Sequence, residues 1–165
     1  MHFGGELHHT IAQLAQALQQ RGWMLATAES CTGGMIAAAC TDLPGSSAWF
    51  ERGFVTYSNT AKTEMLGVPA PLIAVHGAVS EPVVRAMAQG AVAQSLAQVS
   101  VAISGVAGPG GGSNDKPVGT VWLAWCCQER VESACLHCMG DRHSVRMQAV
   151  HYALERLLLL IQPGN

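Results

Sequence analysis

Two polar side chains suggest nucleophilic chemistry, because one of them could activate the other. Ser30 lies in the segment Glu29–Gly34, between an apolar stretch and a run of small residues. A serine hydroxyl attacks a carbonyl group when a base removes its proton, and a desolvated lysine can serve as that base. Lys62 is one of only two lysines in the chain. The alternatives are that Ser30 or Thr32 caps a helix and that Lys62 is an ordinary surface charge.

The residues after Ser30 suit a developing negative charge. If a strand ends near Ala28 and a helix begins near Met35, backbone amides near Gly33 and Gly34 point out of the helix N-terminus. Amides in that position stabilise an anion or the oxyanion of a tetrahedral intermediate. Ligands of open α/β sheets also bind where strands end. We therefore expect the substrate near this turn.

Two other segments have features of a phosphate site. The loop 105–119 is rich in glycine, which lets backbone amides approach and turn toward an anion. It is not a P-loop, because no Gly-Lys-Ser/Thr sequence follows. It is not a dinucleotide-binding fingerprint either, because a strand rather than a helix is expected after it. Arg142 and Arg146 share one face at the start of a helix, where positive charge is unfavourable without an anion. The alternatives are a flexible connector for the loop and pairing of the arginines with Asp141 and Glu155.

The composition excludes several classes of protein. Of the 165 residues, 49% are hydrophobic and 12% are charged, and the mean hydropathy is +0.23, which excludes a disordered chain. The formal net charge of −2 argues against a nucleic-acid binder with a basic surface. No apolar run approaches the ~18 residues of a membrane span, and residues 1–6 lack the features of a signal peptide. We expect one domain over residues 1–165, in the cytoplasm, with no membrane or nucleic-acid partner.

The six cysteines and seven histidines form no clear metal site. Cys135, His137, Cys138 and His143 lie close together, but strand alternation places Cys138 on the opposite face from Cys135 and His137. Without a secretory signal, buried free thiols are the simplest interpretation of the cysteines. We expect neither a metal nor a cofactor.

The hydrophobic pattern predicts helices that alternate with strands. Helices are expected over 7–21, 35–40, 59–66, 80–98 and 142–161, and strands over 23–28, 54–57, 99–104, 118–127 and 131–139. Residues 69–76 are expected to form a loop. The continuous apolar run at 118–127 indicates a strand covered on both faces. This succession predicts an α/β fold, a three-layer helix–sheet–helix domain with a mixed β-sheet.

Six motifs in this order resemble those of the CinA carboxy-terminal domain family. They span residues 28–34, 53–62, 77–80, 105–111, 116–121 and 140–146. The resemblance implies hydrolysis of the carboxamide of nicotinamide mononucleotide to nicotinate mononucleotide and ammonia, in pyridine-nucleotide salvage. It also implies a serine nucleophile that is assisted by lysine, without a metal. Larger family members carry an additional amino-terminal domain, for which we expect no room in this chain.

The resemblance also implies roles for individual residues. Ser30 matches the nucleophile, Lys62 the base and Tyr57 a tyrosine of the same site. The implied substrate-binding positions are Thr32, Gly33, Gly34, Asn59, Gly105, Ala107, Gly108, Gly110, Gly111, Arg142 and Arg146, among which the glycine loop and the arginines are candidates for the phosphate. Cys31 is a rival nucleophile because thiols are intrinsically more nucleophilic, although its side chain is expected to point elsewhere.

Two other functions are compatible with these motifs. One is a non-catalytic nucleotide-binding or regulatory module, linked to competence or DNA damage, and the other is an amidase for a different small carboxamide. The presence of Ser30, Tyr57 and Lys62 favours an enzyme, and the glycine loop and arginines favour a nucleotide substrate. The low charge and the alanine-rich helices favour a homo-oligomer, with a dimer as the first expectation.

Overall fold

A five-stranded sheet forms the centre of the structure, a computed structural model that describes residues 4–162. The strands are β1 (Leu25–Glu29), β2 (Phe50–Val55), β3 (Val99–Gly105), β4 (Thr120–Cys127) and β5 (Arg130–His137). Their order across the sheet is β2-β1-β3-β4-β5. Strand β1 runs parallel to β2 and β3, whereas β4 runs antiparallel to β3 and β5. The sheet is therefore mixed, as the sequence predicts.

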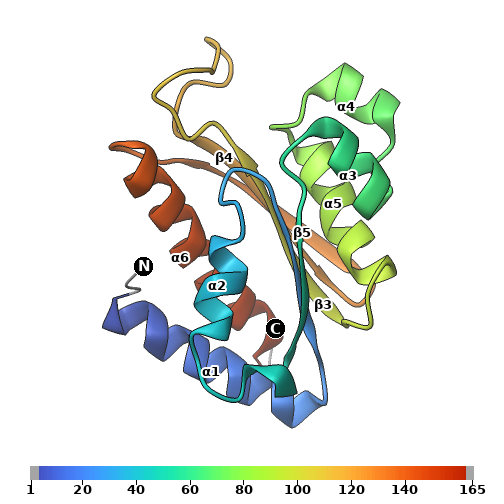
Figure 1. Ribbon diagram of the computed structural model, residues 1–165, viewed down its shortest axis with the longest axis vertical. Coiled ribbons are helices and arrows are strands. Elements are labelled where there is room, and N and C mark those ends of the chain that lie inside the picture. The colour runs from blue at the N-terminus through green and yellow to red at the C-terminus, as the bar shows by residue number, and fades with distance from the viewer. Residues whose placement is uncertain (1–3, 163–165) are drawn as a thin grey trace.

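Helices cover both faces of this sheet (Figure 1). The helices are α1 (Gly5–Arg21), α2 (Met35–Thr41), α3 (Asn59–Leu66), α4 (Ala70–His76), α5 (Glu81–Ala93) and α6 (Arg142–Ile161), with a short 3-10 turn η1 (Ser46–Ala48). Helices α1, α2 and α6 lie on one face, and α3, α4 and α5 lie on the other (Figure 1). This arrangement confirms the predicted three-layer helix–sheet–helix domain.

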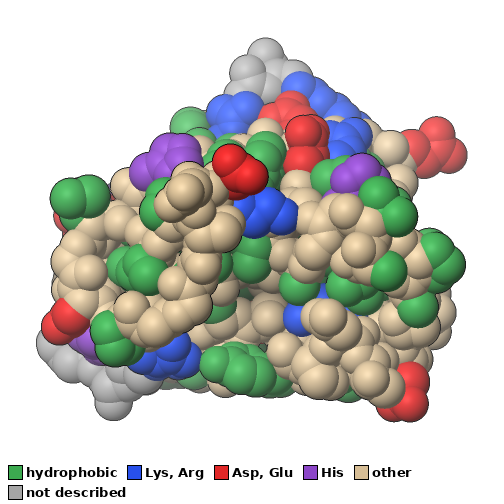
Figure 2. Space-filling model, turned by 90° about the horizontal axis from the view of Figure 1, so that it is seen from above, with side chains coloured by type: hydrophobic (Ala, Val, Ile, Leu, Met, Phe, Trp, Pro, Cys, Tyr) green, Lys and Arg blue, Asp and Glu red, His purple; other side chains and the backbone are tan. Residues whose placement is uncertain are grey.

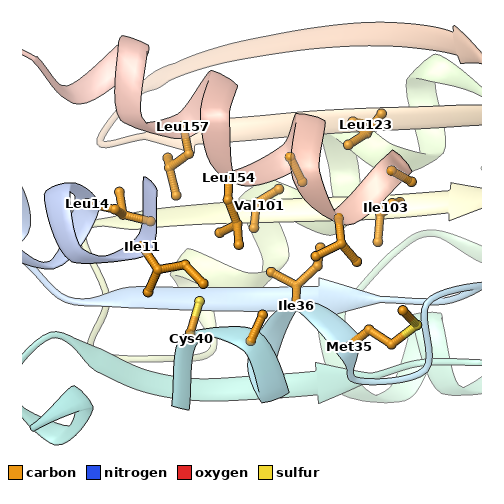
Figure 3. Packing of buried hydrophobic residues seen from close by; sticks show 14 of the residues in the cluster. Ile11, Leu14, Met35, Ile36, Cys40, Val101, Ile103, Leu123, Leu154 and Leu157 are labelled. Carbon is orange, nitrogen blue, oxygen red and sulfur yellow. The ribbon is translucent and has the colours of Figure 1, made fainter. Parts of the chain in front are cut away.

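The larger core lies between the sheet and α1, α2 and α6. Strand side chains alternate between the two faces, so that Val101 and Ile103 of β3 point into this core. Ile36 of α2 and Leu154 of α6 meet them there with no exposed surface (Figure 3). These large aliphatic side chains fill the layer and fix the position of α2 relative to the end of β1.

The core on the other face contains smaller side chains. Ala26 and Ala28 of β1 and Ala102 of β3 point toward α5. A Cβ atom at Gly90 would lie 2.0 Å from the carbonyl oxygen of Leu66, so that only glycine permits this approach of α5 to the end of α3. The small residues thus bring α3 and α5 close to the sheet.

Three expected elements differ most from the structure, whereas the ends of the other elements agree to within two residues. Residues 70–76 form α4 rather than a loop. Amides in the first turn of a helix have no hydrogen-bond partner within the helix, so that a proline there, which lacks an N–H, does not prevent the helix. Helix α5 ends at Ala93 rather than near residue 98. Just after Ala93, the Ser95 hydroxyl donates to the carbonyl oxygen of Ala91 and accepts from the Ala97 amide, and these bonds compete with continuation of the helix. Strand β2 spans residues 50–55 rather than 54–57, since its pairing with β1 begins at Phe50.

Residues 4–162 contain neither a membrane-spanning helix nor a cluster of metal-binding side chains. No helix within residues 4–162 is long and apolar enough to cross a membrane. In the same range, no cluster of three or more His, Cys, Asp or Glu side chains could hold a metal ion. The first three residues of the amino-terminal segment considered above lie outside the described residues.

Candidate functional site

A tight turn at the end of β1 places Ser30 at the carboxyl edge of the sheet. The Ser30 amide donates to the carbonyl oxygen of Ile103 at 3.0 Å, and the Gly33 amide donates to that of Ser30 at 3.0 Å. Gly33 and Gly34 have φ angles of +58° and +97°, a region that L side chains rarely adopt. The glycines are thus needed to turn the chain from β1 into α2 immediately after Ser30.

Lys62 contacts Ser30 from helix α3. The Ser58 hydroxyl accepts a hydrogen bond from the Ala61 amide, and this cap starts α3 one turn before Lys62. The Lys62 side chain is only 1% exposed. Its Nζ donates to Ser30 Oγ at 3.0 Å and to the carbonyl oxygen of Thr56 at 2.8 Å.

The environment of Lys62 shifts its protonation equilibrium toward the neutral amine. Burial lowers the pKa of the amine, because the charged form loses hydration that two hydrogen bonds replace only in part. The two groups are 32 positions apart in the chain but lie in direct contact. The geometry is therefore that of a hydroxyl beside a desolvated amine that can accept its proton.

Glu29 holds the turn from the other side of the sheet. Its Oε1 accepts from Thr32 Oγ1 at 2.7 Å and from the Ile36 amide at 2.9 Å. Its Oε2 accepts from the Ala37 amide at 2.9 Å. The alternative that Ser30 or Thr32 caps α2 is therefore wrong, because the N-cap position is Gly34 and the Glu29 side chain satisfies the first helix amides.

The two arginines of α6 contact different parts of the site. Arg142 donates to the carbonyl oxygen of Gly108 at 2.9 Å and to the Tyr57 hydroxyl at 3.1 Å, at the outer rim. Arg146 donates to the carbonyl oxygens of Cys31 and Thr32 at 3.1 and 3.0 Å, behind the turn. Among residues 4–162, neither arginine forms an ion pair.

The alternative partners for these arginines do not hold them. The Asp141 carboxyl group accepts from the Ser144 amide and caps α6. Within the part of the chain that the structure describes, Glu155 forms no ion pair with Arg142 or Arg146. Pairing with Asp141 and Glu155, one interpretation of the sequence, is therefore wrong.

A cavity of about 210 Å³ lies between the turn, α3 and the glycine loop. The residues expected at the site that line it are Ser30, Tyr57, Asn59, Lys62, Gly105, Ala107 and Arg142. The expected positions that do not line it are Thr32, Gly33, Gly34, Gly108, Gly110, Gly111 and Arg146. Seen from this end, the molecule shows mostly backbone and uncharged polar atoms, with Lys or Arg atoms near the centre (Figure 2).

The comparison with known proteins agrees with the motifs in the sequence. The CinA C-terminal domain matches residues 7–161, which include every element around the cavity. The chain belongs to this family.

Relatives in the CinA family include named enzymes. The nicotinamide-nucleotide amidohydrolase PncC of Escherichia coli strain K12 is 55% identical over 153 residues, which cover 92% of this chain and 93% of that protein. The protein of the same name from Pseudomonas putida is 57% identical over 148 residues, which cover 90% and 92%.

A solved CinA structure has the same fold. The competence/damage inducible protein CihA from Agrobacterium tumefaciens superposes with a TM-score of 0.94 at 43% identity, and the match covers 98% of this chain and 99% of that chain. A CinA superfamily protein from Escherichia coli superposes with a TM-score of 0.91 at 37% identity, covering 97% and 94%. The fold is therefore common to the family.

Several residues that line the cavity were not predicted from the sequence to be part of the site. Cys31, Ala78, Val79 and Ser104 also line it, although none was expected to bind substrate. Ala78 and Val79 lie in one of the six motifs, and Ser104 ends the apolar run of β3, so that their positions were visible but carried no chemical signal. Glu29 was missed as well, although an acidic residue just before a helix is a recognisable capping signal.

Proposed function

We propose that the chain is a nicotinamide-nucleotide amidohydrolase that converts nicotinamide mononucleotide and water to nicotinate mononucleotide and ammonia. The contact between Lys62 Nζ and Ser30 Oγ, at 3.0 Å inside the cavity, carries the proposal. The relatives named above, at 55% and 57% identity over about nine-tenths of the chain, support the choice of substrate.

In the first half of the proposed reaction, Ser30 becomes acylated. Lys62 Nζ takes the proton from Ser30 Oγ, which attacks the carboxamide carbon and forms a C–O bond. The backbone N–H of Cys31, the residue of the turn after Ser30 that lines the cavity, stabilises the oxyanion of the tetrahedral intermediate. Lys62 returns the proton to the carboxamide nitrogen, the C–N bond breaks, and ammonia leaves.

In the second half, water releases the product. Lys62 takes a proton from water, and the hydroxide that forms attacks the acyl carbon. The tetrahedral intermediate collapses with cleavage of the bond to Ser30 Oγ, which recovers a proton from Lys62. Nicotinate mononucleotide leaves, and both side chains return to their starting states. Every proton transfer in this scheme uses a single buried amine.

The rim of the cavity provides a site for the phosphate. A guanidinium has five N–H donors, and Arg142 uses two groups for Gly108 and Tyr57, which leaves donors for a phosphate oxygen. Tyr57 is 62% exposed, so that a substrate can reach this pair from solvent. Arg146 is directed at carbonyl groups of the turn, and we assign it to support of the turn rather than to the phosphate.

The first experiment measures ammonia release from nicotinamide mononucleotide by purified, chelator-treated protein. We expect release by the wild type, and a decrease in kcat on the order of 10³- to 10⁶-fold in Ser30→Ala. Activity within tenfold of the wild type in Ser30→Ala would exclude Ser30 as the nucleophile. No release by the folded wild type would favour the nucleotide-binding module instead.

The dephosphorylated riboside provides the second arm of this experiment. If Arg142 binds the phosphate, nicotinamide riboside should have a higher KM than the mononucleotide, and Arg142→Met should raise the KM of the mononucleotide alone. Equal kinetics for the two compounds would favour an amidase for another small carboxamide.

A further inference from the structure

Ser104 is a polar residue of the cavity that has no role in the scheme above. Ser104 lines the cavity from β3 and is only 1% exposed. None of the residues that the structure describes forms a hydrogen bond with its hydroxyl. The unpaired hydroxyls of Thr27, Thr56 and Thr120 are wholly buried, whereas that of Ser104 keeps a small accessible surface at the cavity that it lines. A hydroxyl that has no partner in the fold and is open to a substrate cavity is available to a ligand.

Another serine on the same strand shows what a structural hydroxyl looks like here. Ser100 Oγ donates to the carbonyl oxygen of Ala88 in α5 at 2.6 Å. Ser100 and Ser104 are four residues apart and point to the same face of the sheet, because strand side chains alternate. Ser100 is fully buried and satisfied by α5. Ser104 lies beyond this contact, where the strand reaches the cavity.

The register of the sheet places Ser104 next to Ser30. In the parallel pairing of β1 with β3, Glu29 lies opposite Ile103. The next position along each strand is Ser30 and Ser104, and the Ser30 amide still donates to the carbonyl oxygen of Ile103. Lys62 reaches Ser30 from α3, on the face that Ser104 also occupies. Ser104 is thus the neighbour of Ser30 on the adjacent strand, and both residues line the cavity together with Lys62.

The reaction needs an acceptor at this place. The leaving nitrogen of a carboxamide carries two N–H groups, which keep their hydrogen-bonding needs when the substrate enters a cavity without water. Lys62 Nζ can only donate to this nitrogen when it delivers a proton. Ser30 Oγ forms the new bond to carbon. Of the two neighbouring hydroxyls, Ser104 Oγ alone therefore remains to accept from the leaving group.

We propose that Ser104 is a further catalytic residue, whose Oγ accepts an N–H of the substrate carboxamide and orients the leaving nitrogen toward Lys62. The inference rests on the proposed function. No bond forms or breaks at Ser104. Its hydrogen bond holds the nitrogen while the proton passes from Lys62 Nζ to it, the C–N bond breaks and ammonia departs.

The test compares two leaving groups in two matched variants. The substrates are nicotinamide mononucleotide and the methyl ester of nicotinate mononucleotide, which give the same acyl group but lose ammonia or methanol. The ester has no N–H for Ser104 to accept. Because kcat/KM reports the steps up to acylation, the shared deacylation does not enter the comparison.

We expect Ser104→Ala to lower kcat/KM for the amide by roughly 10- to 100-fold and for the ester by less than about threefold. Its melting temperature should stay the same or rise, because the hydroxyl has no partner in the fold. Ser100→Ala should show the reverse pattern, with a lower melting temperature and unchanged activity on both substrates. Ser104→Cys, with a similar volume and a weaker acceptor, should repeat the loss on the amide alone.

Several outcomes would overturn the inference. One is an equal loss on amide and ester in Ser104→Ala, which would indicate a structural role, and another is no loss on the amide. A drop in the melting temperature as large as that of Ser100→Ala would show that Ser104 has a partner within the fold. Ser30→Ala keeps the two proposals separate, because it should abolish both reactions, and activity in that variant would overturn the proposed function instead.

Discussion

Glu29 and Lys62 are both buried ionisable side chains next to the turn that carries Ser30, but their surroundings differ. The Glu29 carboxyl group faces α2, and its two oxygens accept three hydrogen bonds. The Lys62 amine faces the cavity from α3, where it has two partners and a lowered pKa. A fully satisfied group is held in place, whereas an incompletely satisfied one can exchange a proton. The first therefore supports the turn, and the second is suited to react with it.

After the loss of Ser30 itself, removal of the Lys62 amine should have the largest effect on activity. We expect Lys62→Ala to lower kcat on the order of 10³-fold, because the base and the acid are lost together. Lys62→Arg should not restore activity, since a guanidinium does not deprotonate at accessible pH. The measurement is ammonia release under saturating substrate.

The other lysine of the chain is the matched control. Lys116 donates to the carbonyl oxygen of His76 at 2.7 Å and thereby connects the glycine loop to the end of α4. Lys116→Ala should lower kcat by less than tenfold. A similar loss in the Lys116 and Lys62 variants would contradict the distinction between a surface lysine and a reactive one.

Disruption of the Glu29 network should act mainly on stability. In Glu29→Gln, one oxygen becomes an NH2 group that faces N–H or O–H donors, so that at least one hydrogen bond is lost and a donor is left buried. We expect the free energy of unfolding to fall by about 3 kcal/mol. Denaturant unfolding measures this change, and Thr32→Val, which removes a single donor, should cost about 1 kcal/mol. A Glu29→Gln protein of unchanged stability would show that this side chain does not hold the turn.

The activity should rise with pH because neutral Lys62 is the reactive form. At pH values below the pKa of Lys62, kcat/KM should increase up to about tenfold per pH unit. Burial lowers this pKa, so that the increase should end below the ordinary pKa of a lysine. A pH–rate profile tests this, and a rise that continues to the ordinary lysine pKa would contradict desolvation of the amine.

Stability should follow pH in the same direction. Between the lowered pKa of folded Lys62 and the ordinary pKa of the unfolded chain, the unfolded chain binds the additional proton. Raising the pH through that window therefore favours the folded protein. Lys62→Met should lack this contribution, and unfolding curves of both proteins at several pH values measure the difference.

The smallest effect is expected at Cys31. Burial raises the pKa of its thiol to about 11, so that the thiolate is scarce at neutral pH. Cys31→Ala should change kcat by less than about threefold, in the same ammonia assay. A loss comparable to that of Ser30→Ala would make the thiol the nucleophile and contradict the proposed scheme.

Much of this architecture follows from local sequence patterns. The steps between Leu7, Ile11, Leu14 and Leu18 predict α1, and the continuous apolar run at 118–127 predicts a strand covered on both faces, which β4 confirms. The predicted ends of helices and strands were less accurate than the predicted order of these elements. A loop is expected over residues 69–76, whereas packing of Ile73 against the smaller core stabilises a short helix there.

The sequence by itself determined the sharp turn after β1, because only glycine readily adopts the φ angles of residues 33 and 34, and it determined the three-layer α/β class through the succession of apolar segments. The tertiary structure alone decided which polar groups meet. The contact between Ser30 and Lys62, the direction of Arg146 toward the turn and the position of Ser104 beside Ser30 depend on sheet register and helix packing. These contacts join residues that are far apart in the chain, and no local pattern specifies a distance between such residues.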